Sequence, residues 1–314
     1  MELRKDYILN RWVYLATERR KRPKEFKQKE VKEKKGTCFF CPGNEGLTPP
    51  EIGRVGSKKK WKLRWFPNKF PAVKLEGEAE PRTDNKFFTF ASGYGKHEVI
   101  VETPDHEKQL WDLPKERIRK VFEIYQQRID ELSKLDNIKY VIIFKNHGRA
   151  AGTSLIHSHT QLAAIGLIPE TIKEKLEAVK EYEHCPYCDI INIEKGSFRR
   201  CFENETMVAF TPYASRFNFE IWVLPKRHVK GLGEFNEKEF SDLAEIMKKI
   251  LVKLKELNVS YNYYLQYAPA KEDLHFHIEV APRIANWAGF EFSSGAIINS
   301  VTPEDAAKFY RGED

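Results

Sequence analysis

The sequence of 314 residues has no long apolar run and little cysteine. No stretch is long and apolar enough to cross a bilayer, and residues 1–6 lack the apolar core of a signal peptide. We therefore expect a cytoplasmic protein without a membrane partner. Four of the five cysteines form two CxxC pairs, which in a reducing compartment indicate metal binding more than disulfide bonds.

A concentrated basic surface is also lacking. The 53 lysines and arginines outnumber the 46 acidic residues and give a net charge of +7, but they are spread along the chain. Because nucleic-acid binding needs a clustered basic face, we expect no nucleic-acid partner, whereas a mild positive charge suits small anions such as nucleotides. The aromatic share of 13% indicates a packed core rather than disorder.

The two halves of the chain repeat the same order of elements. Each half has a CxxC pair, a strand followed by a histidine, a long helix, a second strand and an HxH motif. His106 precedes His157 by 51 residues, and His228 precedes His275 by 47. We interpret this pattern as tandem duplication of one α+β unit, in which an antiparallel sheet carries helices packed on it. The predicted units are residues 1–168 and 169–314, and the predicted helices are residues 114–132, 169–182 and 235–257.

Each half supplies four potential metal ligands. Two thiols, the histidine after the strand and the first histidine of HxH make the S₂N₂ set that tetrahedral Zn²⁺ accepts. A closed four-ligand site would be structural, and it would fix where the second histidine of HxH points. The alternative is that one or both pairs are reduced thiols in the core. The predicted zinc sets are Cys38, Cys41, His106 and His157 in the first half, and Cys185, Cys188, His228 and His275 in the second.

The segment from residue 146 to 161 combines small residues with histidines. Gly148 and Gly152 let the backbone come close to a ligand, and Thr153 and Ser154 add hydroxyl donors suited to a phosphate. From position 155 onward, alternate side chains would share one face of a strand. The sequence therefore predicts two imidazoles and an amide, at positions 157, 159 and 161, beside a phosphate-binding loop.

With His157 committed to metal, His159 is available as a nucleophile. A neutral imidazole attacks phosphorus near neutral pH and can pass the group on. Gln161 cannot act as a general acid, but it can donate a hydrogen bond to a phosphoryl oxygen, which favours nucleotidyl transfer over hydrolysis. In the second half Glu279 takes the place of Gln161 and would repel a phosphate. We therefore expect the first unit to carry the active site and the second to be a scaffold.

These motifs resemble the galactose-1-phosphate uridylyltransferase branch of the histidine-triad superfamily. The resemblance implies duplicated histidine-triad-like units, a homodimer and zinc at two sites per chain. It also implies a ping-pong reaction that moves UMP from UDP-glucose to galactose-1-phosphate or another hexose-1-phosphate through a uridylyl-histidine at His159. The middle residue of the first HxH is Ser158, where the family usually has proline. The segments that carry the resemblance are residues 38–44, 103–106, 146–161, 224–228 and 274–277.

The resemblance further implies a set of substrate-binding residues. They comprise basic residues for phosphate, a base and ribose pocket, a phosphate-contacting loop and a sugar-binding stretch in the second unit. In that order they are Arg19 and Arg22; Phe39, Asn68, Lys69 and Phe70; Asn146, Gly152, Thr153 and Ser154; and Phe290 and Glu291.

Two other functions stay open at this point. The first is an ADP-sugar or dinucleoside-polyphosphate phosphorylase of the same fold, which would use ADP in place of UDP and inorganic phosphate as acceptor. The second is a non-catalytic, zinc-stabilised nucleotide-binding protein, which would bind nucleotide tightly without covalent labelling.

Overall fold

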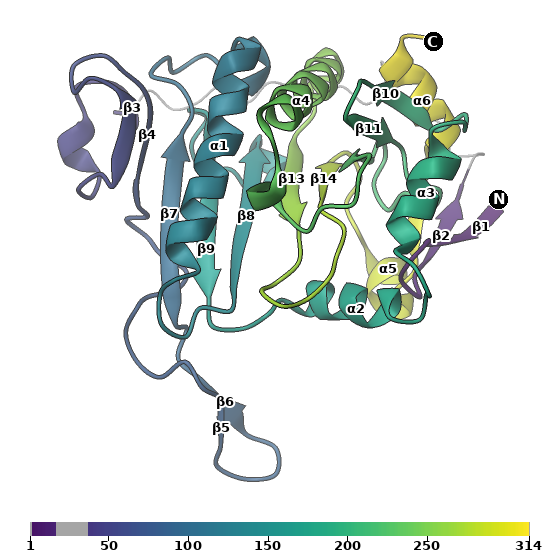
Figure 1. Cartoon of the computed structure of the whole chain (residues 1–314), viewed down its shortest axis with the longest axis horizontal. Helices are drawn as coiled ribbons and strands as arrows, with labels where there is room; N and C mark the ends of the chain where they lie inside the picture. The colour runs from purple at the N-terminus through teal and green to yellow at the C-terminus, as the bar shows by residue number, and fades with distance from the viewer. Residues whose placement is uncertain (1, 17–36, 314) are drawn as a thin grey trace.

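A single large sheet organises the molecule (Figure 1). Within residues 2–16 and 37–313, which the computed structural model describes, this sheet has ten strands and every neighbouring pair is antiparallel. In spatial order they are β10 (Arg200–Glu203), β11 (Met207–Phe210), β12 (Ile221–Pro225), β14 (His277–Pro282), β13 (Tyr261–Gln266), β8 (Tyr140–His147), β9 (His159–Ile165), β7 (Gly95–Val101), β4 (Trp61–Pro67) and β3 (Gly53–Gly56).

The order of the strands is mirrored about the centre of the sheet. β8 of the first half pairs with β13 of the second, and Phe144 lies opposite Tyr264. Moving outward from this pair, β9, β7, β4 and β3 on one side match β14, β12, β11 and β10 on the other. The predicted α+β fold with a repeated antiparallel unit is confirmed, and the two repeats share one continuous sheet.

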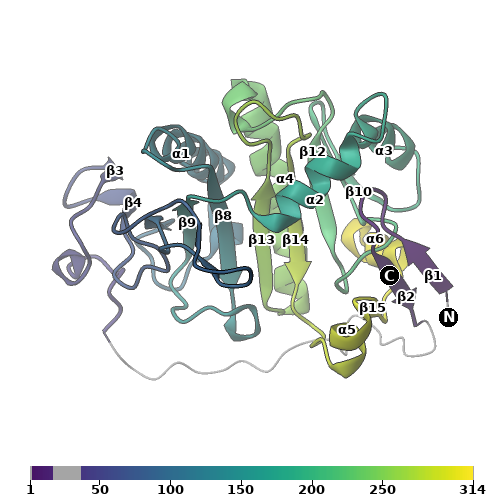
Figure 2. The same cartoon turned by 90° about the horizontal axis from the view of Figure 1, so that it is seen from below.

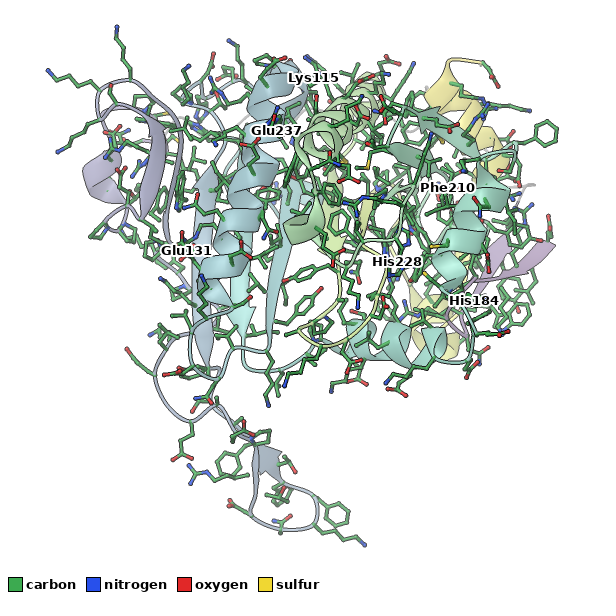
Figure 3. All side chains as sticks on the ribbon, in the orientation of Figure 1. Lys115, Glu131, His184, Phe210, His228 and Glu237 are labelled. Carbon is green, nitrogen blue, oxygen red and sulfur yellow. The ribbon has the colours of Figure 1, made fainter. Side chains whose placement is uncertain are left out.

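Two long helices, α1 (Lys115–Leu132) and α4 (Glu237–Leu257), cover one face of this sheet (Figures 1 and 2). Lys115 and Glu131 mark the two ends of α1 in Figure 3. α1 buries an apolar stripe at helical spacing, including Ile118, Phe122 and Tyr125. α4 begins with a capping box in which Asn236 and Glu239 bond each other's backbone N–H groups. Both helices were predicted within about three residues of their ends.

Apart from one hairpin in the first half, the remaining elements lie around the second half of the sheet and at its edges. β1 (Glu2–Lys5), β2 (Trp12–Leu15) and β15 (Ile297–Asn299) form a separate three-stranded sheet, so residues 2–15 pack with the end of the chain. The division at residue 168 stays a prediction. The shorter helices are α2 (Glu170–Val179), α3 (Pro186–Glu194), α5 (Gly289–Ser294) and α6 (Pro303–Arg311), and β5 (Arg82–Thr83) pairs with β6 (Thr89–Phe90) in a projecting hairpin (Figure 1).

The predicted strand start at position 155 is wrong. β9 begins at His159, because its partner β7 ends at Val101, directly opposite His159. Residues 155–158 lie outside the ladder, and His157 is therefore placed by its side-chain contacts rather than by strand alternation. No helix in the described ranges has the length and apolarity that a membrane span requires.

Candidate active site and metal centres

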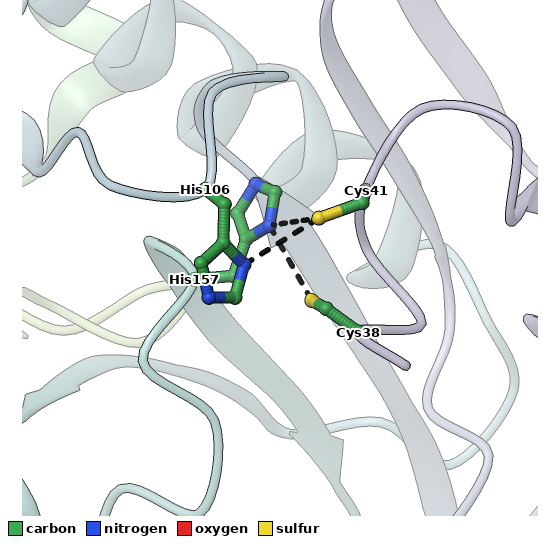
Figure 4. A group of neighbouring side chains, drawn as sticks. All are labelled: Cys38, Cys41, His106 and His157. Carbon is green, nitrogen blue, oxygen red and sulfur yellow. Dashed lines mark hydrogen bonds between the residues drawn. The ribbon is translucent and has the colours of Figure 1, made fainter. Parts of the chain in front are cut away.

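The four residues of the first predicted zinc set converge on one point (Figure 4). Cys38 and Cys41 lie in the loop before β3, His106 follows β7, and His157 precedes β9. Cys38 Sγ lies 3.5 Å from His157 Nδ1, and Cys41 Sγ lies 3.4 Å from His106 Nδ1. All four potential ligand atoms lie within 4.8 Å of one another.

This geometry fits a tetrahedral zinc ion. With Zn–S bonds of about 2.3 Å and Zn–N bonds of about 2.0 Å, the S···N edges of a tetrahedron are about 3.5 Å. The observed S···N separations of 3.4 Å, 3.5 Å and 3.7 Å match this length. His157 Nε2 donates to Thr103 O at 2.7 Å, which leaves Nδ1 unprotonated for a metal. Burial, then the neighbouring Cys38, raises the pKa of Cys41 to about 11, so its thiolate needs a cation near neutral pH.

The second predicted set repeats this arrangement in the other half of the sheet. Cys188 Sγ lies 3.5 Å from His275 Nδ1 and 3.7 Å from His228 Nδ1, and Cys185 Sγ lies 3.8 Å from His275 Nδ1. His275 Nε2 donates to Pro225 O at 3.0 Å, as His157 does to Thr103 in the first set. His228 is labelled in Figure 3. Both clusters can bind a metal, and their donor sets suit zinc.

His159 lies at the start of β9 with 8% of its surface exposed. Its Nδ1 lies 2.8 Å from His157 O. Because a carbonyl oxygen only accepts, Nδ1 carries the proton and Nε2 keeps the lone pair. Burial, then the charge of Lys145, lowers the pKa of His159 to about 4, so the ring is neutral near pH 7. Phe40 packs edge-on against the ring at a centroid distance of 5.3 Å. The imidazole is held in the tautomer that a nucleophile needs.

Gln161 is oriented by His97, a residue that the sequence analysis missed. Ala72 N donates to His97 Nδ1 at 3.1 Å, so the other ring nitrogen carries the proton and donates to Gln161 Oε1 at 3.0 Å. This bond turns the amide oxygen toward His97 and leaves the NH₂ group as the donor. Val99 pairs with Gln161 across the ladder, and His97 stands two residues before Val99 on the same face. Strand alternation combined with the correct register would have found it.

The predicted phosphate loop and His159 line one cavity of about 1100 Å³. Gly148 and Gly152 in this loop have φ values of 80° and 86°, a left-handed backbone that favours glycine. A Cβ at Gly148 would lie 2.3 Å from Ser260 Oγ, so a larger residue would not fit there. The predicted residues that line the cavity are His106, Asn146, Thr153, Ser154, His157 and His159.

Asn146 closes the loop onto the second half of the sheet. Its Oδ1 accepts a hydrogen bond from Asn262 Nδ2 at 2.8 Å, and its backbone oxygen accepts one from the Thr153 hydroxyl. Asn262 also donates to Ala151 O at 2.9 Å. The second unit therefore supports the loop that faces His159.

The residues predicted for the base and ribose pocket form a separate, more open surface. Asn68 N donates to His97 O at 2.8 Å, which connects this surface to the residue that orients Gln161. Lys69 Nζ lies 5.6 Å from the centre of the Phe39 ring. Phe70 is 80% exposed and Phe39 40% exposed. Two aromatic faces and a cation are thus available to a ligand on this surface, but none of its four residues lines the cavity beside His159.

Phe290 and Glu291, predicted to contact the sugar, lie on α5. Phe290 packs edge-on against Tyr14 at a centroid distance of 5.5 Å. Of the described residues that line the cavity beside the predicted nucleophile, none comes from α5, so a single chain does not bring these two residues to that cavity. Arg19 and Arg22 lie outside the described residues.

The corresponding position in the second unit is filled by the protein itself. His277 Nε2 accepts from Lys175 Nζ at 2.8 Å. Glu279 forms ion pairs with Lys175 and with Arg216, the latter at 2.8 Å, and Tyr264 donates to it at 2.7 Å. Burial alone would raise the pKa of Glu279, but the two cations outweigh it and hold this pKa well below 4.5. The second HxH motif is therefore buried beneath a charged cluster, and Lys175, Arg216 and Glu279 of this cluster line a separate cavity of about 380 Å³.

These features define a duplicated protein of the histidine-triad type. The family described as "Galactose-1-phosphate uridyl transferase, N-terminal domain" matches residues 1–169, and a family described as a domain of unknown function, DUF4921, matches residues 112–309. The chain belongs to the galactose-1-phosphate uridyl transferase family.

Relatives cover almost the whole chain. An ADP-glucose phosphorylase of Arabidopsis thaliana is 34% identical over 99% of this chain and 92% of its own length. A galactose-1-phosphate uridylyltransferase of Thermotoga maritima is 32% identical over 99% of this chain and 98% of its own. The crystal structure of an Arabidopsis thaliana ADP-glucose phosphorylase with bound ADP-glucose has a TM-score of 0.84 at 33% identity and covers 99% and 98% of the two chains. A structure of a uridylyltransferase has a TM-score of 0.77 at 28% identity, with the same coverage.

Proposed function

We propose that this protein is a nucleotidyltransferase that moves UMP between UDP-glucose and a hexose-1-phosphate such as galactose-1-phosphate through His159. The observation that carries the proposal is the tautomer of His159. Its Nδ1–H is tied to His157 O at 2.8 Å, so the Nε2 lone pair belongs to a buried ring beside a hydroxyl-bearing loop.

The reaction has two in-line displacements at the α-phosphorus. In the first, Nε2 of His159 forms a P–N bond while the bond from phosphorus to the leaving sugar phosphate breaks. In the second, a phosphate oxygen of the acceptor forms a P–O bond while the P–N bond breaks. The NH₂ group of Gln161 and the hydroxyl of Ser154 stabilise the negative charge on the phosphoryl oxygens, while Thr153 holds the loop in shape by donating its hydroxyl to Asn146 O.

Zinc is proposed as a structural ion at both Cys₂His₂ clusters. When bound, it would neutralise the thiolates and hold His157, whose carbonyl fixes the ring of His159. We also propose a homodimer, because a second chain could bring α5, with Phe290 and Glu291, to the cavity of the first. A cytoplasmic location stays a prediction from the sequence.

The test is intact-mass measurement after mixing with UDP-glucose and no acceptor. We expect wild-type protein to gain the mass of one UMP and the His159→Gln variant to gain none. Wild-type protein that binds nucleotide tightly without any covalent gain would instead support the non-catalytic alternative. Steady release of free UMP without sugar phosphate would indicate a hydrolase.

A second candidate is transfer of AMP from ADP-glucose to inorganic phosphate. It is favoured by the 34% identity to an ADP-glucose phosphorylase over 99% of this chain. The same geometry of His159 serves both reactions, so the base pocket decides between them. Parallel incubations with UDP-glucose and ADP-glucose would show which donor labels His159 faster.

A further inference from the structure

A buried ion pair lies beneath the proposed nucleophile, on the face of the sheet that α1 covers. Lys145 of β8 and Glu102, the residue after β7, are 1% and 0% exposed. Lys145 Nζ lies 2.6 Å from Glu102 Oε2. The adjoining hydroxyl of Thr160 meets Tyr125 OH of α1 at 2.6 Å, so the pair lies between the sheet and the helix, and Lys145 also lines the cavity beside His159.

The pair holds three consecutive residues around the nucleophile. Lys145 Nζ donates to Ser158 Oγ and to His159 O, both at 3.0 Å. Glu102 accepts from the hydroxyl of Ser158 and, at 2.6 Å, from Thr160 Oγ1. The backbone N–H of Glu102 also donates to Ser158 O at 3.1 Å. Backbone and side chains from position 158 to 160 are thus tied to one charged pair.

The second unit has only hydrocarbon at the matching positions. Ser158 and Phe276 are the middle residues of the two HxH motifs, and Thr160 and Ile278 follow them. Phe144 pairs with Gln161, and Tyr264 pairs with Glu279. The residues that come next, Lys145 and Leu265, therefore occupy matching positions. His157 donates to Thr103 O, and His275 donates to Pro225 O. The residues just before these carbonyls, Glu102 and Leu224, therefore also match. The four apolar counterparts, all at most 2% exposed, are Leu224, Leu265, Phe276 and Ile278.

This contrast indicates that the fold does not need the charges. A buried ion pair can often be replaced by hydrocarbon of similar volume with no loss of stability, and sometimes with a gain. The duplicate unit forms the same strands and the same Cys₂His₂ cluster over an apolar layer. The charged pair is therefore specific to the unit that carries His159.

We propose that Glu102, Lys145 and Ser158 are positioning residues for His159, which hold its backbone so that Nε2 meets the α-phosphorus in line. The inference rests on the proposed function. His159 Nδ1 is bonded to His157 O, so a shift of the backbone at 157–160 would turn the ring. A displacement of about 1 Å at a reacting group can slow an enzyme about a hundredfold.

The experiment gives the first unit the residues of the second at two of the four positions, as the double variant Glu102→Leu/Lys145→Leu. We expect it to stay folded with a thermal midpoint close to that of wild type, because removal of the buried charges offsets the hydrogen bonds that Ser158 and Thr160 lose. At saturating nucleotide sugar, the rate of covalent labelling and kcat should fall about 10- to 100-fold, while KM stays within about twofold. Ser158→Ala, which removes one tether and leaves the ion pair, should show a smaller loss in the same direction.

A matched control is the double variant Glu98→Leu/Arg128→Leu. Arg128 Nε and Glu98 Oε2 form another buried pair between α1 and the same sheet, at 2.8 Å, 2% and 0% exposed. Within the described residues, neither Glu98 nor Arg128 forms a side-chain hydrogen bond with residues 157–160. Its labelling rate should stay within about twofold of wild type.

The outcomes separate this inference from the proposed function. A folded Glu102→Leu/Lys145→Leu variant that is labelled at the wild-type rate overturns the positioning role and leaves the function intact. The role is equally overturned if that variant does not fold and Ser158→Ala is labelled at the wild-type rate. If wild-type protein takes no nucleotidyl group from UDP-glucose or ADP-glucose, the proposed function fails and the inference fails with it.

Discussion

The two halves of the molecule place their buried charges on opposite faces of one sheet. In the first half the charges, Lys145 and Glu102, lie on the helix-covered face beneath His159. In the second half they lie on the other face, where Glu279 pairs with Lys175 of α2 and with Arg216. The first HxH motif therefore lines a cavity itself, whereas the second is covered by ion pairs, and it is these ion pairs that line a smaller cavity.

This difference shows how a duplicated unit becomes a scaffold without losing its fold. Both halves keep the strand order and a Cys₂His₂ cluster. The change lies in a few positions: Gln161 against Glu279, and the glycine loop against residues 268–274, which contain no glycine. A carboxylate at position 279 repels a phosphate but attracts two cations, which then seal the motif.

The largest expected difference between the halves comes from removing the second histidine of each HxH. His159→Ala should lower turnover by at least about a thousandfold, because the proposed nucleophile is gone. His277→Ala should leave turnover close to wild type at temperatures where it is folded. It should lower the free energy of unfolding by about 1–3 kcal/mol, because Lys175 loses a buried partner. Steady-state kinetics and urea unfolding of both variants check this, and equal losses of turnover would contradict the comparison.

The next test makes the first half resemble the second. Gln161→Glu should lower turnover about a thousandfold, because a carboxylate would face the phosphoryl group and remove a donor. Gln161→Ala, the uncharged control, should lose about a hundredfold through the missing hydrogen bond alone. Measurement of kcat/KM for both variants separates repulsion from loss of the donor. Equal rates would mean that charge at this position does not distinguish the halves.

Metal removal should affect the halves unequally. We expect about two zinc ions per chain, and about one in each of the variants Cys41→Ser and Cys188→Ser. Cys41→Ser should lower turnover about 10- to 100-fold, because His157 holds the ring of His159. Cys188→Ser should lower turnover less than Cys41→Ser. The measurement is metal analysis of protein purified without chelator, combined with steady-state kinetics. Wild-type protein that contains no zinc would contradict the proposed metal sites.

The sequence was sufficient where the structure depends on local pattern or on spacing repeated in both halves. The long helices follow from apolar residues at helical spacing, which the structure confirms as the buried stripes of α1 and α4. The two metal clusters follow from a ligand order that appears twice. Because each ligand motif occurs once in each half, its occurrence in the second half independently supports the interpretation of the first.

The sequence was insufficient where the register between distant strands decides the contact. His97 reaches Gln161 only because Val99 lies opposite Gln161 on β9. Lys145 and Glu102 are 43 residues apart in a chain with many lysines and glutamates, and nothing local pairs them. The start of β9 was placed too early because it depends on where β7 ends, at Val101.

The smallest expected effect on turnover comes from opening the sealed motif. Glu279→Gln should lower the free energy of unfolding at pH 7 by about 3–5 kcal/mol, because it leaves Lys175 buried without its anion. Turnover of the folded variant should be unchanged. The pKa of Glu279 is lower in the folded protein than its ordinary 4.5, so its stabilisation is fully present above about pH 4.5 and is lost as the pH falls further. Urea unfolding between about pH 3 and pH 7 should therefore show a shallower acid loss in the variant than in wild type. A variant that lost turnover while staying folded would mean that the second half takes part in the chemistry, and the contrast between the halves would have to be abandoned.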